Sequence, residues 1–264
     1  RCRFLLLWKT MIEYGLDTLF DSYNGKARLY PALITLSPII WSASLLIPHF
    51  ALDITKIAAA LLIICFLFLL ANITRSFGKF LEEKLLNEWE AWPTTIMLRH
   101  RDNRIDTFTK SRYHAALSAI CDGVQFPTAI EEQKLPNTAD ECYRTAINWL
   151  IELRRGPQYK ILNDENASYG FRRNLLGLKP FALMISFIAA SITGFAWWLS
   201  IPEKTSFDSV IEAIRNTPVL PIFVIVDTMY FFLFILVIRK TFVLQAAYEY
   251  SVALLKTLDR SESK

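Results

Sequence analysis

The chain has 264 residues, of which 53% are hydrophobic and 20% charged. Soluble domains of this length rarely reach such an apolar content, so the composition excludes an ordinary water-soluble globular protein. The formal net charge of +4 says little by itself, because in a membrane protein the positions of the charges carry the information.

The first thirty residues, 1–30, are predicted to form a cytoplasmic N-terminal segment. The apolar run from Phe4 to Trp8 is shorter than the core of a secretory signal, so no cleaved signal is expected. Met11 opens an amphipathic stretch, MIEYGLDTLFDSY. We therefore interpret residues 1–10 as lying upstream of the translation start.

Four later segments are apolar over about 20 residues, the helix length that crosses about 30 Å of hydrocarbon. They run from Pro31 to Phe50, Ile54 to Ile73, Pro180 to Leu199 and Val219 to Ile238. The first two form one hairpin over 31–73, and the last two form a second hairpin over 180–238 with an outer loop at 200–218. Pro31 and Pro180 are placed in the first helical turn, where a proline costs least. The sequence thus predicts an all-α polytopic membrane protein with four transmembrane helices in two hairpins.

The basic residues predict the orientation of these helices. Of the 29 Lys and Arg residues, sixteen lie in 75–179, five in the first thirty residues and five in 239–264. The positive-inside rule then places both termini and the central insert in the cytoplasm, and the two hairpin loops outside. Trp197 and Trp198 fall at the outer interface and Tyr30 at the inner one, as expected for amphipathic rings.

The insert, residues 74–179, is predicted to be a helical cytoplasmic domain, followed after the second hairpin by a cytoplasmic C-terminal helix over 239–264. Apolar residues at 3-to-4 spacing extend the second span as a stalk that ends at Trp92. TTIMLR is interpreted as a short extended piece, Asp106 as the cap of a helix, and Pro127 and Pro136 as the openings of two more helices. The faces expected to point inward carry Phe108, Tyr113, Ala116, Leu117 and Ile120, and then Cys142, Ala146, Trp149, Leu150 and Leu153.

Asp227 lies near the middle of the fourth span, where an ionised carboxylate costs at least a few kcal/mol. One interpretation is functional, either a proton or cation step or gating. The other is structural, a carboxyl group that bonds to a polar group on another span. The polar groups available to it are Ser37, Ser42, Ser44, Lys56 and Thr193.

Small residues recur every four positions on the third span, at Ser186, Ala190 and Gly194. Such a stripe lets another backbone approach closely. The contact is expected either within the protomer or between protomers, and the second alternative predicts a homo-oligomer.

Basic residues are concentrated in RHRDNRIDTFTKSRYH and again just before the third span. Guanidinium groups beside stacking rings suit phosphate-bearing ligands such as nucleotides or nucleic acid. Basic residues near a cytoplasmic leaflet are equally expected for orientation and lipid contact. The residues concerned are Arg99, Arg101, Arg104, Arg112, Arg172 and Arg173.

The sequence contains no HExxH, GxSxG or Gly-rich phosphate-loop pattern, so no enzymatic activity, cofactor or metal is expected. His100, His114, Cys121 and Cys142 leave a Cys/His pair open, although buried core cysteines are the simpler interpretation.

The segments KARLYPALITLSPI, WPTTIMLRHRDNRIDTFTKSRYH and YGFRRNLLGLKP resemble those of a family of uncharacterised bacterial inner-membrane proteins with two hairpins around a cytoplasmic insert. The resemblance covers nearly the whole chain from Met11 and implies a multi-pass protein of the cell inner membrane. It carries no established activity and no functional residues.

These features predict a non-enzymatic membrane protein whose insert senses a ligand or partner and acts on the helical bundle, as a membrane-disrupting effector of the defence type. Two alternatives stay open, a small-ion channel or carrier using Asp227 and a membrane scaffold for a soluble partner. The expected partners are the lipid bilayer, a second copy through the third span, and a soluble protein or nucleotide at the insert.

Overall fold

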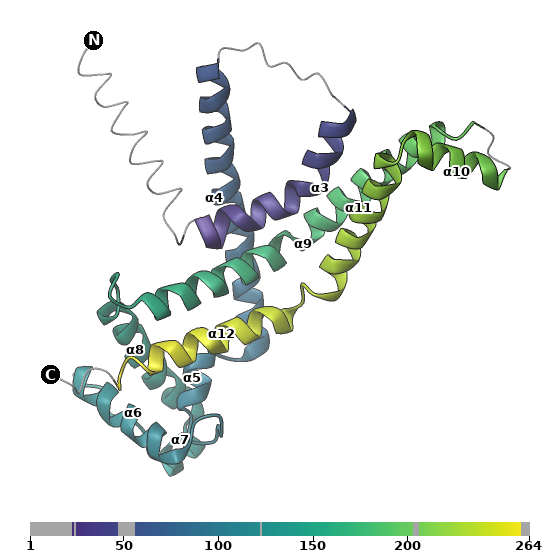
Figure 1. Ribbon diagram of the computed structural model, residues 1–264. Helices are drawn as coiled ribbons and strands as arrows, with labels where there is room; N and C mark the ends of the chain where they lie inside the picture. Colours follow the sequence, from purple (N-terminus) through teal and green to yellow (C-terminus); the bar gives the residue numbers. More distant parts are fainter. Residues whose placement is uncertain (1–22, 24, 47–55, 122, 203–205, 260–264) are drawn as a thin grey trace, which may run out of the picture. The chain divides into compact units, whose positions relative to one another are not determined.

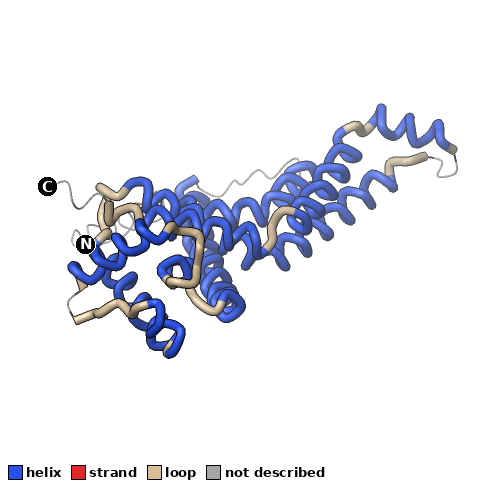
Figure 2. The backbone as a smooth tube through the Cα atoms, turned by 90° about the horizontal axis from the view of Figure 1, so that it is seen from below, coloured by secondary structure: helices blue, strands red, loops and turns tan. Residues whose placement is uncertain are grey.

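Figure 1 shows the computed structural model of the protein, which describes residues 23, 25–46, 56–121, 123–202 and 206–259. Within these residues every regular element is a helix, and Figure 2 shows helices joined by loops and turns. The predicted all-helical class is confirmed. The amphipathic stretch expected from Met11 lies outside the described residues.

Eleven elements follow one another along the described chain. In order they are η1 (Gly25–Leu29), α3 (Tyr30–Leu46), α4 (Lys56–Trp89), α5 (Pro93–Leu98), α6 (Thr107–Ile120), α7 (Ala129–Lys134), α8 (Pro136–Leu153), α9 (Lys160–Leu199), α10 (Phe207–Asn216), α11 (Val219–Leu236) and α12 (Lys240–Leu255). The first, η1, is a π-helix.

The chain forms two compact units. Unit 1 comprises Arg1–Leu81 and Gly170–Phe242, and unit 2 comprises Glu82–Tyr169 and Val243–Lys264. Each of the three divisions falls inside a helix, namely α4, α9 and α12. Domain boundaries more often lie in exposed, flexible linkers. The C-terminal helix, expected as a segment of its own, clusters with the insert in unit 2.

Unit 1 contains the helices that are long and apolar enough to cross a membrane. Two helices in the described chain, α9 and α11, meet that standard. The first predicted hairpin includes residues 47–55, which lie outside the described residues, and α3 has only 17 described residues. The four-span organisation is therefore not confirmed.

The core of unit 1 joins α9 to α11 and α3. Its buried side chains are Leu175, Ala182, Phe234 and Ile238, with Ile34 packed against them. At the C-terminal end of α11 the Lys179 ammonium donates to the carbonyls of Ile235, at 3.2 Å, and Ile238, at 2.7 Å. Carbonyls at a helix end lack intrahelical partners, so this cation holds the end of α11 against α9.

Pro180 was expected at the start of a helix but lies inside α9, which runs unbroken for 40 residues. A proline at this position removes one backbone hydrogen bond. Leu178 and Ala182 on either side of it are buried, so packing offsets that loss. Pro31 was expected in a first helical turn and is the second residue of α3, directly after η1.

Unit 2 packs α5, α6, α7 and α12 around α8. Its core includes Leu98, Leu117, Tyr143, Leu150 and Leu254. The inward face predicted for α8 is confirmed at Ala146 and Leu150, which are buried. It was wrong at Trp149 and Leu153, which are exposed, while Tyr143 and Ile147 are buried instead.

The helix starts predicted for the insert are largely confirmed. The Asp106 carboxylate accepts from the Thr109 N–H and caps α6, Thr128 forms a capping box with Glu131 at α7, and Pro136 is the first residue of α8. The expected extended piece was wrong, because Pro93–Leu98 is helix α5. Phe108, expected in the core, is 89% exposed.

Candidate functional site

Asp227 of α11 is fully buried, with 0% of its surface exposed. Its carboxylate accepts a hydrogen bond from Trp41 Nε1 at 2.7 Å and another from Ser42 Oγ at 3.2 Å, and Thr193 Oγ1 lies 3.4 Å away. Ser42 and Thr193 were among the partners expected from sequence, but Trp41 was not. The contacts tie α3, α9 and α11 together around one carboxylate.

A second polar contact between α3 and α11 lies beside the first. The Tyr230 hydroxyl donates to the Ile34 carbonyl, and the Ser37 hydroxyl lies 3.1 Å from the Tyr230 hydroxyl. The ring of Tyr230 meets that of Trp41 edge to face at 5.6 Å. Ser37 therefore contacts Tyr230 rather than Asp227. The side chains of Ser44 and Lys56 lie outside the described residues.

The small-residue stripe of the third span faces other helices of unit 1. Ser186 is fully buried, whereas Ala190 and Gly194 are half-buried. A Cβ on Gly194 would lie 3.9 Å from Val224 of α11. This contact is within the protomer, and the predicted oligomer stays a prediction.

Arg172 and Arg173, predicted to contact phosphate or lipid, both have partners in unit 1. Arg172 lies over the Phe242 ring, 4.7 Å from its centroid. Arg173 is buried and donates to the Asn174 side-chain oxygen at 3.1 and 3.2 Å. Asn174 in turn donates to the Ala27 carbonyl at 2.6 Å. The pair thus anchors η1 to α9.

The four arginines of the basic segment in unit 2 do not converge on one ligand site. Arg99 forms a bidentate pair with Asp140 at 2.7 and 2.9 Å. Arg104 pairs with Asp102, Arg112 pairs with Asp259 at 2.9 Å, and the Arg101 side chain is exposed. Their binding of phosphate or lipid stays a prediction.

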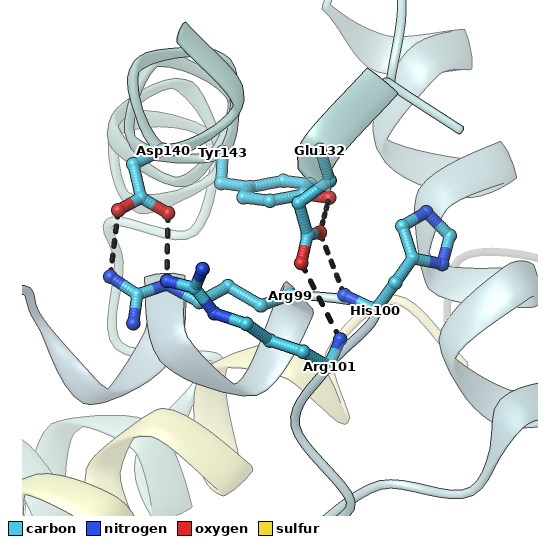
Figure 3. A network of polar contacts seen from close by, with 6 residues as sticks. All are labelled: Arg99, His100, Arg101, Glu132, Asp140 and Tyr143. Atoms are coloured by element: carbon cyan, nitrogen blue, oxygen red, sulfur yellow. Dashed lines mark hydrogen bonds and ion pairs between the residues drawn. The ribbon is translucent and has the colours of Figure 1, made fainter. Parts of the chain in front are cut away.

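Glu132 is only 3% exposed and lies at the centre of a buried polar network in unit 2 (Figure 3). It accepts from the Tyr143 hydroxyl at 2.7 Å and from the backbone N–H groups of His100 at 2.8 Å and Arg101 at 3.4 Å. Burial acts to raise the pKa of Glu132, but these hydrogen bonds outweigh it and lower the pKa. The network fixes the loop after α5 against α7 and α8.

Two further basic groups are buried beside this network. Lys110 Nζ donates to the Arg99 carbonyl at 2.6 Å and to the Asp102 carbonyl, and burial lowers its pKa. His114 stacks on Phe126 and Tyr143, and its Nε2 lies 2.9 Å from the Leu98 carbonyl. Burial lowers the pKa of His114 from 6.5 to about 4.

We expect unit 2 to lose stability as the pH falls from about 6.5 to about 4. The unfolded chain binds the His114 proton near pH 6.5 and the folded chain near pH 4, so acid favours unfolding by roughly 3 kcal/mol in total. Urea unfolding midpoints at pH 4.5 and 7.5 measure this loss. His114→Gln should remove most of the pH dependence. An unchanged pH dependence in His114→Gln contradicts the assignment.

Cys142 and the described histidine rings lie against backbone carbonyls. Among the residues that the structure describes, no His, Cys, Asp and Glu side chains gather in a group of three or more that could hold a metal ion. Cys142 donates to the Gln125 carbonyl at 3.3 Å, and burial raises the pKa of its thiol. His100 Nε2 lies 2.9 Å from the Pro127 carbonyl, so each described histidine ring is engaged by backbone.

A cavity of about 410 Å³ in unit 2 was not foreseen from sequence. It is lined by Leu86, Asn87, Glu90, Ala91, Trp92, Thr95, Asn137, Asp140, Glu141 and Arg144. Thr95 is 3% exposed, yet its hydroxyl forms no hydrogen bond with another described residue. Glu141 and Arg144 likewise form no ion pair within the described chain. Unlike Glu132, these polar groups are available to a ligand.

The only sequence sign of this cavity is the Trp92-Pro93 pair, which was expected to end the stalk. In the structure α4 already ends at Trp89, and Pro93 begins α5. Glu90, directly after α4, has a left-handed φ of 66°, a conformation usually taken by glycine or asparagine at a helix C-terminus. The break lets α5 turn back so that its buried Thr95 lines the same cavity as α8.

Over the residues that the structure describes, these features define an all-helical protein with two helices long and apolar enough to span a membrane. No family model matches the chain, and neither the curated proteins nor the solved structures gave a match.

Proposed function

We propose that the chain is an integral protein of the bacterial cytoplasmic membrane in which unit 2 senses a ligand or partner and acts on the membrane helices of unit 1. Four transmembrane helices in two hairpins, with both termini and the insert in the cytoplasm, are part of this proposal. The distribution of Lys and Arg supports the orientation.

Exposed apolar side chains support lipid contact around unit 1. On α11 they include Ile222, Ile225, Met229, Phe232 and Leu236. On α3 and α4 they include Ile39, Ile40, Phe66, Phe68 and Leu69. Large apolar surfaces of this kind are rare on soluble monomers and are expected where lipid tails cover them.

The observation that carries the sensing role is the position of α4. Its last turn lines the cavity of unit 2 through Leu86 and Asn87, and the same helix begins in unit 1 at Lys56. A ligand in the cavity therefore contacts a helix that both units share. Under this proposal, the ligand binds two arrangements of α4 with different affinity, as any ligand-driven change requires.

The output that we propose is depolarisation of the membrane, as in a membrane-disrupting effector. Induced expression in bacteria, followed with a potential-sensitive dye, tests it. The membrane potential is expected to fall in proportion to the amount of chain in the membrane fraction. An unchanged potential at every induction level contradicts the effector role.

The scaffold role is a second candidate because unit 2 exposes large apolar side chains. Phe108, Ile130 and Leu135 are all exposed, and such residues often serve protein contacts. A scaffold predicts that the intact chain retains a soluble partner and leaves the membrane potential unchanged. The ion-carrier role depends on Asp227 and is separated from the others by the substitutions discussed below.

A further inference from the structure

Helix α10 presents three different faces. Successive residues of a helix are about 100° apart, so Phe207, Val210, Ile211 and Ile214 form one apolar stripe. Asp208, Glu212, Arg215 and Asn216 occupy a second, polar face. The third face carries the small residues Ser209 and Ala213.

The structure buries the small-residue face of α10 and covers the apolar stripe only in part, because Val210 and Ile211 are half-buried. Ser209 and Ala213 are buried, whereas Phe207 is 76% and Ile214 is 42% exposed. Phe207 and Ile214 thus point away from the described protein. Exposure of these side chains to water is unfavourable, because burying a large apolar side chain contributes a free energy of about 1.5–3 kcal/mol.

The position of α10 indicates which environment covers its apolar face. The chain leaves α9 at Leu199 and enters α11 at Val219, and Figures 1 and 2 show α10 at the shared end of these two helices. The hydroxyl groups of Ser200, just after α9, and Thr217, just before α11, lie 3.3 Å apart. Leu199 and Val219 are themselves exposed, so the apolar surface of the two candidate spans continues towards α10.

We propose that α10 is an interfacial helix that lies among the phospholipid headgroups of the outer leaflet, with Phe207, Val210, Ile211 and Ile214 directed towards the acyl chains. Amphipathic helices bind membranes in this way. The polar face carries two acidic residues and one basic residue, so the binding is driven by apolar burial rather than by anionic lipid. This proposal rests on the proposed transmembrane location of α9 and α11.

The test is the accessibility of spin labels in phosphatidylcholine nanodiscs. Single cysteines are introduced along α10 in a full-length chain whose four native cysteines are replaced by serine. Labels at Val210→Cys and Ile214→Cys are expected to be several-fold more accessible to oxygen than to a water-soluble nickel complex. Labels at Asp208→Cys and Glu212→Cys should show the reverse.

Labels at Ile225→Cys and Met229→Cys of α11 separate the two proposals. If these are in lipid and all α10 labels are in water, or are shielded from both reagents by protein, the interfacial helix is refuted while the span survives. If the α11 labels are also in water, the span itself is refuted. Adding Phe207→Ser to Val210→Cys should raise its nickel accessibility, whereas Glu212→Ser should leave it unchanged. Equal effects of the two substitutions would overturn the assigned face.

Discussion

Replacing Gly78 of α4 with alanine is expected to destabilise unit 1 by about 3 kcal/mol, from overpacking and the loss of a buried hydrogen bond. A Cβ at this position would lie 1.7 Å from the Asn174 side-chain oxygen and 3.2 Å from Arg173 Nε. Asn174 would have to move and give up its 2.6 Å hydrogen bond to the Ala27 carbonyl. The midpoint of thermal unfolding in detergent measures the effect.

Gly194→Ala is the matched control for this substitution. The added Cβ meets only Val224, at 3.9 Å, which is an ordinary contact, so a small gain from helix propensity is expected. Combining Gly78→Ala with Asn174→Ala should recover much of the stability, because the two residues are in contact and their effects are then not additive. Strictly additive losses would show that the clash is not the cause.

Asp227→Leu is expected to cost roughly 3 kcal/mol, because it leaves the Trp41 N–H and the Ser42 hydroxyl without their acceptor. Asp227→Asn keeps an oxygen for Trp41, and its amide can donate to the Ser42 hydroxyl. We therefore expect the asparagine variant to stay within about 1 kcal/mol of the wild type. Thermal unfolding of the reconstituted chain gives both values.

The comparison of these two variants also decides between the roles considered for Asp227. A structural tie needs hydrogen-bonding atoms, whereas a proton or cation step needs a group that ionises. Thr228→Val, at an exposed neighbour of Asp227, serves as the control and should change little. If Asp227→Asn retains the stability but abolishes ion flux into proteoliposomes, the result supports the carrier role. The structural role alone would then not account for Asp227.

The helices of the insert could be predicted because their signals are local. Asp106, Thr128 and Pro136 each mark a helix start through contacts within a few residues. The inward face of α8 could not be derived in the same way. A 3-to-4 spacing fits both Cys142 with Trp149 and Tyr143 with Ile147, because the two stripes are neighbours on one helix. Only tertiary packing decides between them.

The polar sites were harder to predict than the helices because their partners are remote in sequence. Trp41 and Asp227 are 186 positions apart, and no periodicity connects them. Glu131 and Glu132 are chemically alike, yet the first is exposed and the second is buried beneath Tyr143. The concentration of arginines was visible in the sequence, but their division among separate acidic partners depends on the fold.

The proposal that unit 2 controls the membrane helices through α4 is tested most directly at Glu83. This residue is exposed and lies just beyond the division between the units. Glu83→Pro removes a backbone hydrogen bond inside α4 and breaks or kinks the helix, whereas Glu83→Ala preserves it. With equal amounts of chain in the membrane, we expect Glu83→Ala to depolarise induced cells as the wild type does and Glu83→Pro to leave their potential unchanged. Equal depolarisation by the two variants would contradict control through this helix.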